Sequence, residues 1–104
     1  MTKYIRLPTY AYTIVLGVCR AYEVWHAGRA PHAIQQEMVD AVDAAAARVM
    51  YGEERAILPM IHAIAVRAPY RRTSPEIIMA YSESTFQRRK NRLINAIAYE
   101  LEIM

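Results

Sequence analysis

Residues 73–101 read TSPEIIMAYSESTFQRRKNRLINAIAYEL, and this stretch decides the fold because it contains two helix starts in close succession. The first start is Thr73-Ser74-Pro75, where a hydroxyl residue able to cap a helix precedes a proline suited to its first turn. The second is the hydroxyl-rich segment Ser82-Glu83-Ser84-Thr85. The sequence therefore predicts a helix of about two turns, a tight turn, and a long helix from about Glu83 to near the C-terminus.

The long helix is predicted to be amphipathic. Its apolar side, at helical spacing, consists of Phe86, Leu93, Ile94, Ile97 and Leu101. With about 100° per residue, the opposite side carries Ser84, Arg88, Asn91, Arg92 and Asn95. Lys90 falls on the side of Phe86, so its stem is expected to lie along the edge of the core.

Two amphipathic helices are predicted at the N-terminal end. The first should begin near Pro8 and stop near Gly28, with Tyr10 and Tyr12 helping to fill an apolar stripe formed by Ile14, Val18, Tyr22 and Trp25. The second should begin at Pro31 and stop at Gly52, and its stripe is Ile34, Met38, Val42, Ala45 and Val49.

A third helix is predicted over residues 53–67, with an apolar face of Ile57, Ile61, Ile64 and Ala65. Pro59 is tolerated only in a first turn, so this helix either begins nearer Ala56 or is kinked. No segment alternates apolar and polar residues between hairpin turns. The fold class is therefore predicted to be all-α, with about five helices in one domain, 1–104. Residues 8–67 would form a scaffold and residues 73–104 a helix-turn-helix.

Composition narrows the class of protein. The chain has 104 residues, 55% of them hydrophobic, and one cysteine, Cys19, which is expected to be a small buried apolar side chain. No apolar run approaches the roughly 20 residues of a membrane span, and the start lacks the pattern of a secretory signal. We therefore expect a cytoplasmic protein without a membrane partner.

The positive charge is concentrated in one segment. Residues 1–66 contain six basic and six acidic residues, whereas residues 67–92 contain seven basic residues and two acidic ones, a net charge of +5. A cluster of this sign attracts polyanions, and its arginine-rich character favours nucleic acid over membrane. A solvated surface helix would show the same charge pattern.

Two helices joined by a short turn, the second with arginines on its outer side, are typical of a helix-turn-helix that binds double-stranded DNA. Small hydroxyl residues at the helix start can approach phosphates, while arginine, glutamine and asparagine can read base edges. The candidate DNA contacts are Arg71, Arg72, Ser82, Ser84, Thr85, Gln87, Arg88, Arg89, Asn91 and Arg92.

The segment Tyr81-Ser82-Glu83-Ser84-Thr85-Phe86-Gln87-Arg88-Arg89-Lys90 resembles the recognition helix of phage transcriptional regulators of the ArpU and RinA type, which are related to sigma-factor region four. The resemblance covers about the last third of the chain. It implies control of late phage or prophage genes, with Ser84, Thr85, Gln87, Arg88, Arg89 and Arg92 in DNA-contacting positions. In that family the helix before the turn is longer. Extending it here would put Pro75 in a helix interior at a cost of about 3 kcal/mol, so we expect the short form.

A homodimer built on the N-terminal helices is predicted, because such helices commonly read two-fold sites and the stripe from Ile34 to Val49 is long. RNA polymerase is a further candidate partner. Two alternatives stay open: a small-terminase-like DNA-packaging component of phage, and a helical protein-interaction module with a basic face.

The three histidines have no metal-ligand spacing and no nucleophile elbow is present, so we expect no metal, no cofactor and no enzymatic activity.

Overall fold

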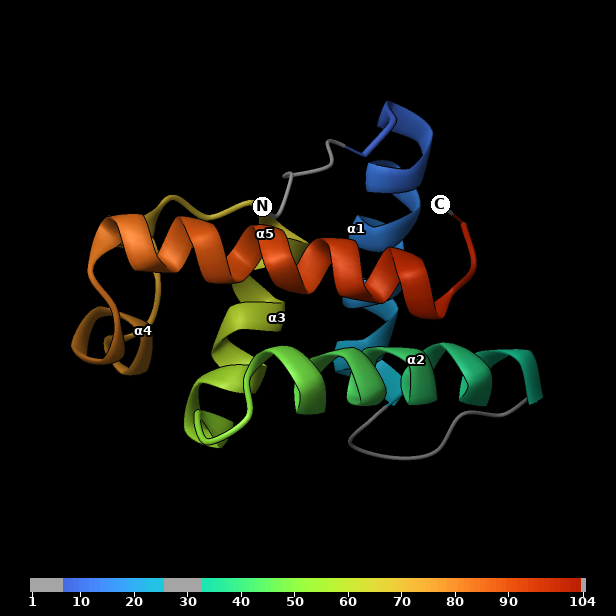
Figure 1. Ribbon diagram of the computed structural model, residues 1–104, viewed down its shortest axis with the longest axis horizontal. Helices are drawn as coiled ribbons and strands as arrows, with labels where there is room; N and C mark the ends of the chain where they lie inside the picture. Colours follow the sequence, from blue (N-terminus) through green and yellow to red (C-terminus); the bar gives the residue numbers. More distant parts are fainter. Residues whose placement is uncertain (1–6, 26–32, 104) are drawn as a thin grey trace, which may run out of the picture.

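The computed structural model describes residues 7–25 and 33–103, and every regular element in these ranges is helical (Figure 1). The α-helices are α1 (Thr9–Trp25), α2 (Ala33–Val49), α3 (Ile57–Val66), α4 (Pro75–Ala80) and α5 (Glu83–Glu100). Two short 3₁₀ turns, η1 (Glu54–Ala56) and η2 (Tyr70–Arg72), precede α3 and α4. The predicted all-α class is confirmed. In the described part of the chain no helix is long and apolar enough to cross a membrane.

Helix α5 is the central element of the fold. It lies alongside α2 and packs on it extensively, while α1 and α3 run across this pair (Figure 1). Helix α1 contacts α2, α3 and α5, so one continuous core joins the four longer helices. Phe86, Leu93 and Ile97 of α5 are fully buried in that core, which confirms the predicted apolar side of the helix. The fold thus uses one side of α5 and leaves the other exposed.

The apolar stripe predicted for α1 is partly wrong. Val18 and Tyr22 are buried, but Ile14 is 42% exposed and Tyr10 is 63% exposed. The buried face consists of Ala11, Val15, Leu16, Val18, Cys19 and Tyr22. Helix α1 has apolar residues on more than one side, and packing against three helices selects the side centred on Val15 and Cys19. The predicted stop at Gly28 lies outside the described residues.

The stripe predicted for α2 is used inside the chain. Val42 and Ala45 are fully buried, and Met38 and Val49 pack against the core, whereas Ile34 is 67% exposed. Helix α5 and helix α1 cover this stripe. Its length therefore does not provide a free surface for a second copy, which corrects the reason given above for a dimer. The predicted start at Pro31 lies outside the described residues.

Helix α3 begins at Ile57, after the η1 turn, and Pro59 lies in its first turn. This confirms the later of the two predicted starts. The helix ends at Val66, and the next residue, Arg67, adopts a left-handed conformation with φ 57°. The backbone N–H of Ala68 donates to the carbonyl of Ala63 over 3.0 Å, which closes the helix in a common C-terminal motif.

Candidate nucleic-acid interface

Helices α4 and α5 are joined by only two residues, Tyr81 and Ser82, both with extended backbone conformations. The N–H of Tyr81 donates to the carbonyl of Ile77 over 2.9 Å and ends α4. The hydroxyl of Ser82 accepts a bond from the N–H of Thr85 over 3.3 Å and caps α5, as the sequence predicts. At the start of α4, Ser74 occupies the cap position but makes no side-chain capping bond, so that expected bond is absent.

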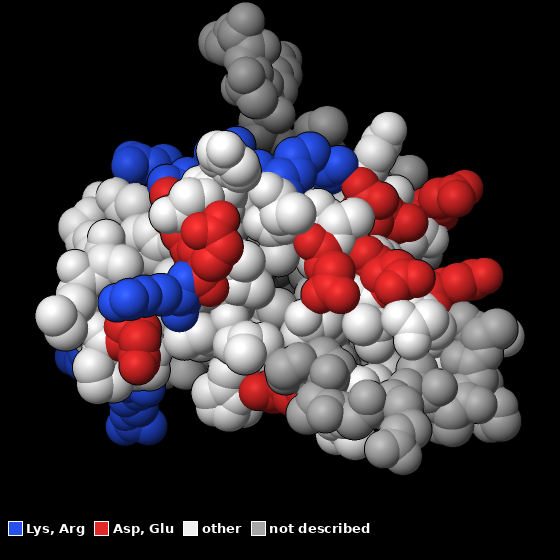
Figure 2. Space-filling view, turned by 90° about the horizontal axis from the view of Figure 1, so that it is seen from below, with Lys and Arg blue, Asp and Glu red and all other residues white. Residues whose placement is uncertain are grey.

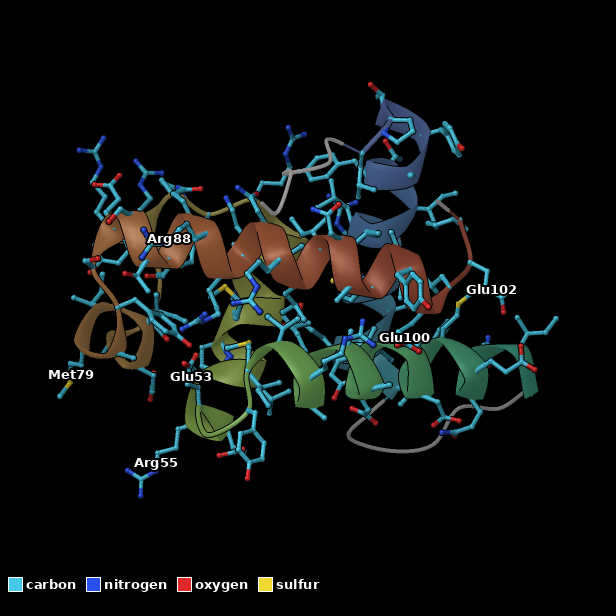
Figure 3. All side chains as sticks on the ribbon, viewed as in Figure 1. Glu53, Arg55, Met79, Arg88, Glu100 and Glu102 are labelled. Carbon is cyan, nitrogen blue, oxygen red and sulfur yellow. The ribbon has the colours of Figure 1, made fainter. Side chains whose placement is uncertain are left out.

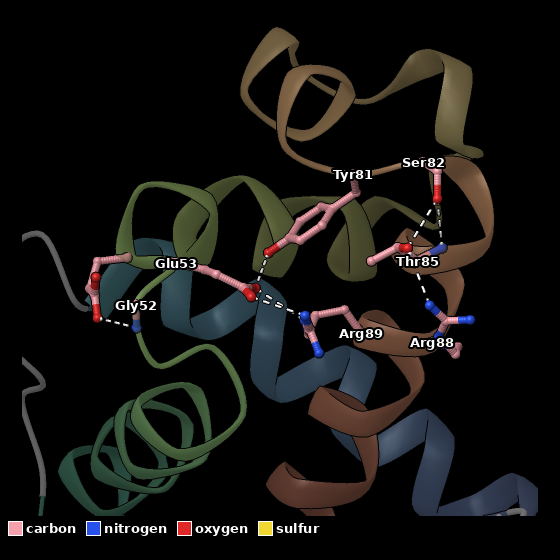
Figure 4. A network of polar contacts seen from close by, with 8 residues as sticks. Gly52, Glu53, Tyr81, Ser82, Thr85, Arg88 and Arg89 are labelled. Carbon is pink, nitrogen blue, oxygen red and sulfur yellow. Dashed lines mark hydrogen bonds and ion pairs between the residues drawn. The ribbon is translucent and has the colours of Figure 1, made fainter.

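The connection between the helices is anchored by Tyr81. Its ring is almost fully buried, and its hydroxyl donates to Oε1 of Glu53 over 2.5 Å (Figure 4). The hydroxyl of Tyr70 donates to the carbonyl of Tyr81. Burial, reinforced by the bond to Glu53, raises the pKa of Tyr81 to about 12. Tyr70 of η2 and Glu53, directly before η1, therefore both fix the position of the connection between α4 and α5.

Arg89 belongs to the same network. Its Nε donates to Oε1 of Glu53 over 3.0 Å and its Nη2 donates to Oε2 over 2.9 Å, a bidentate pair (Figure 4). The guanidinium also lies 5.9 Å from the centroid of the Tyr81 ring. The sequence predicted that Arg89 contacts DNA. In the structure its positive charge is paired with the carboxylate of Glu53.

Arg88 and Arg92 lie on the exposed side of α5. Figure 3 shows Arg88 projecting from the first half of the helix. Its Nη2 donates to Oγ1 of Thr85 over 3.3 Å, and that same oxygen accepts a bond from the Ser82 hydroxyl over 3.0 Å. Among the described residues neither arginine forms an ion pair. Both positive charges are therefore available to a ligand.

Arg71 and Arg72 are exposed on η2 and also lack ion pairs within the described chain. The η2 turn packs on the beginning of α5, where the Tyr70 and Phe86 rings lie 5.6 Å apart between centroids. The side-chain hydroxyl of Thr73 donates to the Tyr70 carbonyl over 2.5 Å and steadies this turn. The fold thus brings the two arginines of η2 next to the N-terminal half of α5.

The remaining predicted contacts differ in exposure. Ser82 and Ser84 are exposed, whereas Thr85, Gln87 and Asn91 are half-buried. The carbonyl of Asn91 accepts a bond from the Asn95 side chain over 2.8 Å. Lys90 lies with its Nζ 5.4 Å from the Phe86 ring centroid, and burial lowers its pKa. This confirms that Lys90 lies along the edge of the core.

Several acidic side chains lie on another part of the surface. Glu37, Asp40 and Asp43 are exposed along α2, and Glu100 and Glu102 lie at the C-terminal end of α5. Figure 2 shows acidic groups spread over this underside, while several basic groups line its upper edge. Glu76 of α4 and Glu83 in the first turn of α5 are also exposed, so the acidic residues are only partly separated from the candidate interface.

Sequence reasoning missed the residues that hold the interface in place. It assigned no contact to Glu53, yet Glu53 bonds to Tyr81 and Arg89, which lie 28 and 36 positions further along the chain. Local spacing carries no signal for contacts at such separations. Within the described residues no cluster of histidine, cysteine and carboxylate groups could hold a metal ion.

Comparison of the chain with protein-family models, with curated proteins and with solved structures finds no match in any of the three. The case for a function therefore depends on the arrangement of side chains described above.

Proposed function

We propose that the chain is a sequence-specific double-stranded DNA-binding protein that regulates transcription, with α5 as its recognition helix. The observation that carries this proposal is a group of four exposed arginines on adjoining elements that form no ion pair with any described residue: Arg71, Arg72, Arg88 and Arg92. Unpaired guanidinium groups bind phosphates and guanine edges in bidentate fashion. On α5, Arg89 does form an ion pair, with Glu53.

The proposed division of roles follows from position. Arg88, Gln87 and Asn91 lie in the first half of α5 and would read base edges in the major groove. Arg71, Arg72 and Arg92, together with Ser82 and Ser84 at the helix start, would contact phosphates and set the register. The likeness of residues 81–90 to the ArpU and RinA type supports late phage or prophage genes as the specific target, with RNA polymerase as a further partner.

The DNA-bound form is proposed to be a homodimer built on the N-terminal helices, because recognition helices of this kind commonly bind two-fold sites. The covered stripe of α2 does not supply the dimer surface, so another face of these helices must.

A competition binding assay tests the proposal. The full chain is incubated with a duplex fragment from upstream of the neighbouring genes, and with unrelated duplex, at low and physiological salt. The Arg88→Ala/Arg92→Ala variant should lose about 1–3 kcal/mol of binding free energy per bidentate base contact removed. The matched control is Arg55→Ala, an exposed arginine on η1 that points away from Arg88 (Figure 3).

Specific binding that survives competition at physiological salt, is lost in the double variant and is kept in the control would support the proposal. If all duplexes compete equally and binding vanishes with salt, the basic surface acts only through charge. That outcome would overturn the proposal and turn attention to protein partners.

A further inference from the structure

Helix α1 carries a second apolar stripe, on the side that the fold leaves open. Its members succeed one another at spacings of four, three, four and three residues: Tyr10, Ile14, Gly17, Ala21 and Val24. Val24 is 71% exposed, Tyr10 and Ile14 are exposed as given above, Gly17 is exposed and Ala21 is half-buried. We name these five residues the α1 seam. Alternating spacings of three and four are typical of helices that pack along one another.

No contact with the described residues explains the glycine at position 17. It lies in the middle of a 17-residue helix, and a Cβ at this position would meet nothing within 4 Å. Glycine weakens a helix interior relative to alanine, and it is favoured where another backbone approaches closely. No element of the described ranges makes that approach, which leaves the position open to a helix of a second copy.

The seam is free of charge, although the chain has a net charge of +3. The two charged residues of α1 are directed to α3 and away from the seam. Nε of Arg20 donates to the carbonyl of Ala65 over 3.0 Å, and Glu23 pairs with Nδ1 of His62 over 2.7 Å. Two copies can therefore meet at the seam without bringing like charges together, whereas a charged partner would find no complementary group there.

We propose that two copies of the chain associate through the α1 seam, with the two α1 helices closest to each other at Gly17. Tyr10 and Ile14 on one side of the crossing point and Val24 on the other fill the space where crossed helices diverge. The contact uses the same residues from both copies, as a two-fold interface requires. The inference gives a surface to the dimer of the proposed function and does not depend on DNA recognition.

The size of the seam sets the expected affinity. A contact confined to one helix per copy buries less than the roughly 1,200 Å² of a standard stable interface. The dissociation constant of the dimer is therefore expected between about 1 μM and 1 mM. Such a dimer forms at high protein concentration, or when two copies are held together on a two-fold DNA site.

Cysteine cross-linking tests which face meets the second copy. Ile14→Cys places a thiol on the seam, and Ile34→Cys places one at a similarly apolar, exposed position on α2. The native Cys19 is fully buried and its pKa is raised to about 12, so it does not compete in the reaction. Under mild oxidation Ile14→Cys should form covalent dimers at least fivefold faster than Ile34→Cys. Equal rates would overturn the proposal.

Gly17→Ala gives a second and independent test. The added methyl group meets nothing within one copy, so the thermal midpoint of the dilute protein should stay the same or rise. The close approach of two helices would be obstructed, and sedimentation velocity should show self-association weakened at least fivefold. Unchanged association in this variant would overturn the proposal, as would a wild-type chain that stays monomeric at millimolar concentration.

The two proposals can fail separately. The Arg88→Ala/Arg92→Ala variant should retain full self-association, since neither arginine lies on α1. If both seam tests succeed but the wild-type chain shows no specific DNA binding, the proposed function alone would be refuted. Specific DNA binding by a chain that fails both seam tests would refute the seam alone.

Discussion

At the scale of single residues, Glu53 has the largest role in holding the candidate interface together. Its carboxylate accepts bonds from the Tyr81 hydroxyl and from two nitrogens of Arg89, and all three groups are largely or partly buried. One side chain thus joins the start of η1, the connection between α4 and α5, and the second turn of α5. The position of the exposed arginines on α5 depends on this junction.

Glu53→Gln should lower the free energy of unfolding by about 1–3 kcal/mol, because it leaves the Arg89 guanidinium without a counter-charge. Urea denaturation followed by circular dichroism measures this change. Glu100→Gln is the matched control. It removes the pair with Arg48, whose side chain is 52% exposed, and should cost less than about 1 kcal/mol. Equal losses in the two variants would show that the contacts of Glu53 stabilise the fold no more than an exposed ion pair does.

The stability of the protein should depend on pH through Tyr81. Its pKa is about 12 in the folded protein and 10.0 for the free side chain, so the folded state binds more protons in this interval. The contribution is fully present below pH 10 and is lost as pH rises to about 12. Tyr22, whose pKa burial and Asp43 also raise, adds to the same slope.

Tyr81→Phe should therefore make the decline in unfolding free energy above pH 10 less steep. The decline that remains in this variant would come from Tyr22. Denaturant titrations at a series of alkaline pH values measure this difference. A variant whose profile runs parallel to that of the wild type would contradict the role given to Tyr81.

At the scale of elements, the two helix starts near the interface differ in how they are capped. Ser82 makes a side-chain capping bond to Thr85, whereas Ser74 makes none. Both serines occupy the position directly before a helix, as the sequence predicts. The difference lies in whether the hydroxyl satisfies a free backbone N–H at the helix end.

Ser82→Ala should lower the free energy of unfolding by about 1 kcal/mol, within the usual range for a lost N-cap. Ser74→Ala, at the equivalent position of α4, should cost clearly less. Chemical denaturation compares the two variants directly. Hydrogen exchange at the first backbone amides of α5 should also accelerate only in Ser82→Ala. A larger loss in Ser74→Ala would show that α4 depends on its hydroxyl in some other way.

At the scale of the whole molecule, the buried residues form one continuous cluster that includes Cys19 of α1, Val42 of α2, Ile61 of α3 and Leu93 of α5. No helix in the described part of the chain has a core of its own. The segments predicted as scaffold and as helix-turn-helix therefore share one core, because α5 packs with the N-terminal helices.

A shared core predicts a single cooperative unfolding transition. Cys19 provides a local probe, since its thiol is fully buried and burial raises its pKa to about 12. Its reactivity toward a thiol reagent in rising urea should follow the loss of helical circular dichroism, with the same midpoint. Reaction of Cys19 before the helices unfold would indicate that α1 separates from the rest independently.

The sequence by itself determined the features that depend on neighbours within about one helical turn. The all-α class, the cap at Ser82 and the buried side of α5 follow from such local relations, whereas for Pro59 they left a choice between a later helix start and a kink. Residues three or four apart lie on the same side of a helix in any fold, so these features could be predicted before any packing was known.

Only the tertiary structure decided which of several possible surfaces is used. It buried the Val15 side of α1 and left Tyr10 and Ile14 exposed, turned the α2 stripe inward, and paired Arg89 with Glu53 while Arg88 stayed free. These outcomes depend on contacts between helices far apart in the chain. A helix with apolar or charged residues on two sides does not specify which side meets a neighbour, because that choice belongs to the packing of all the helices together.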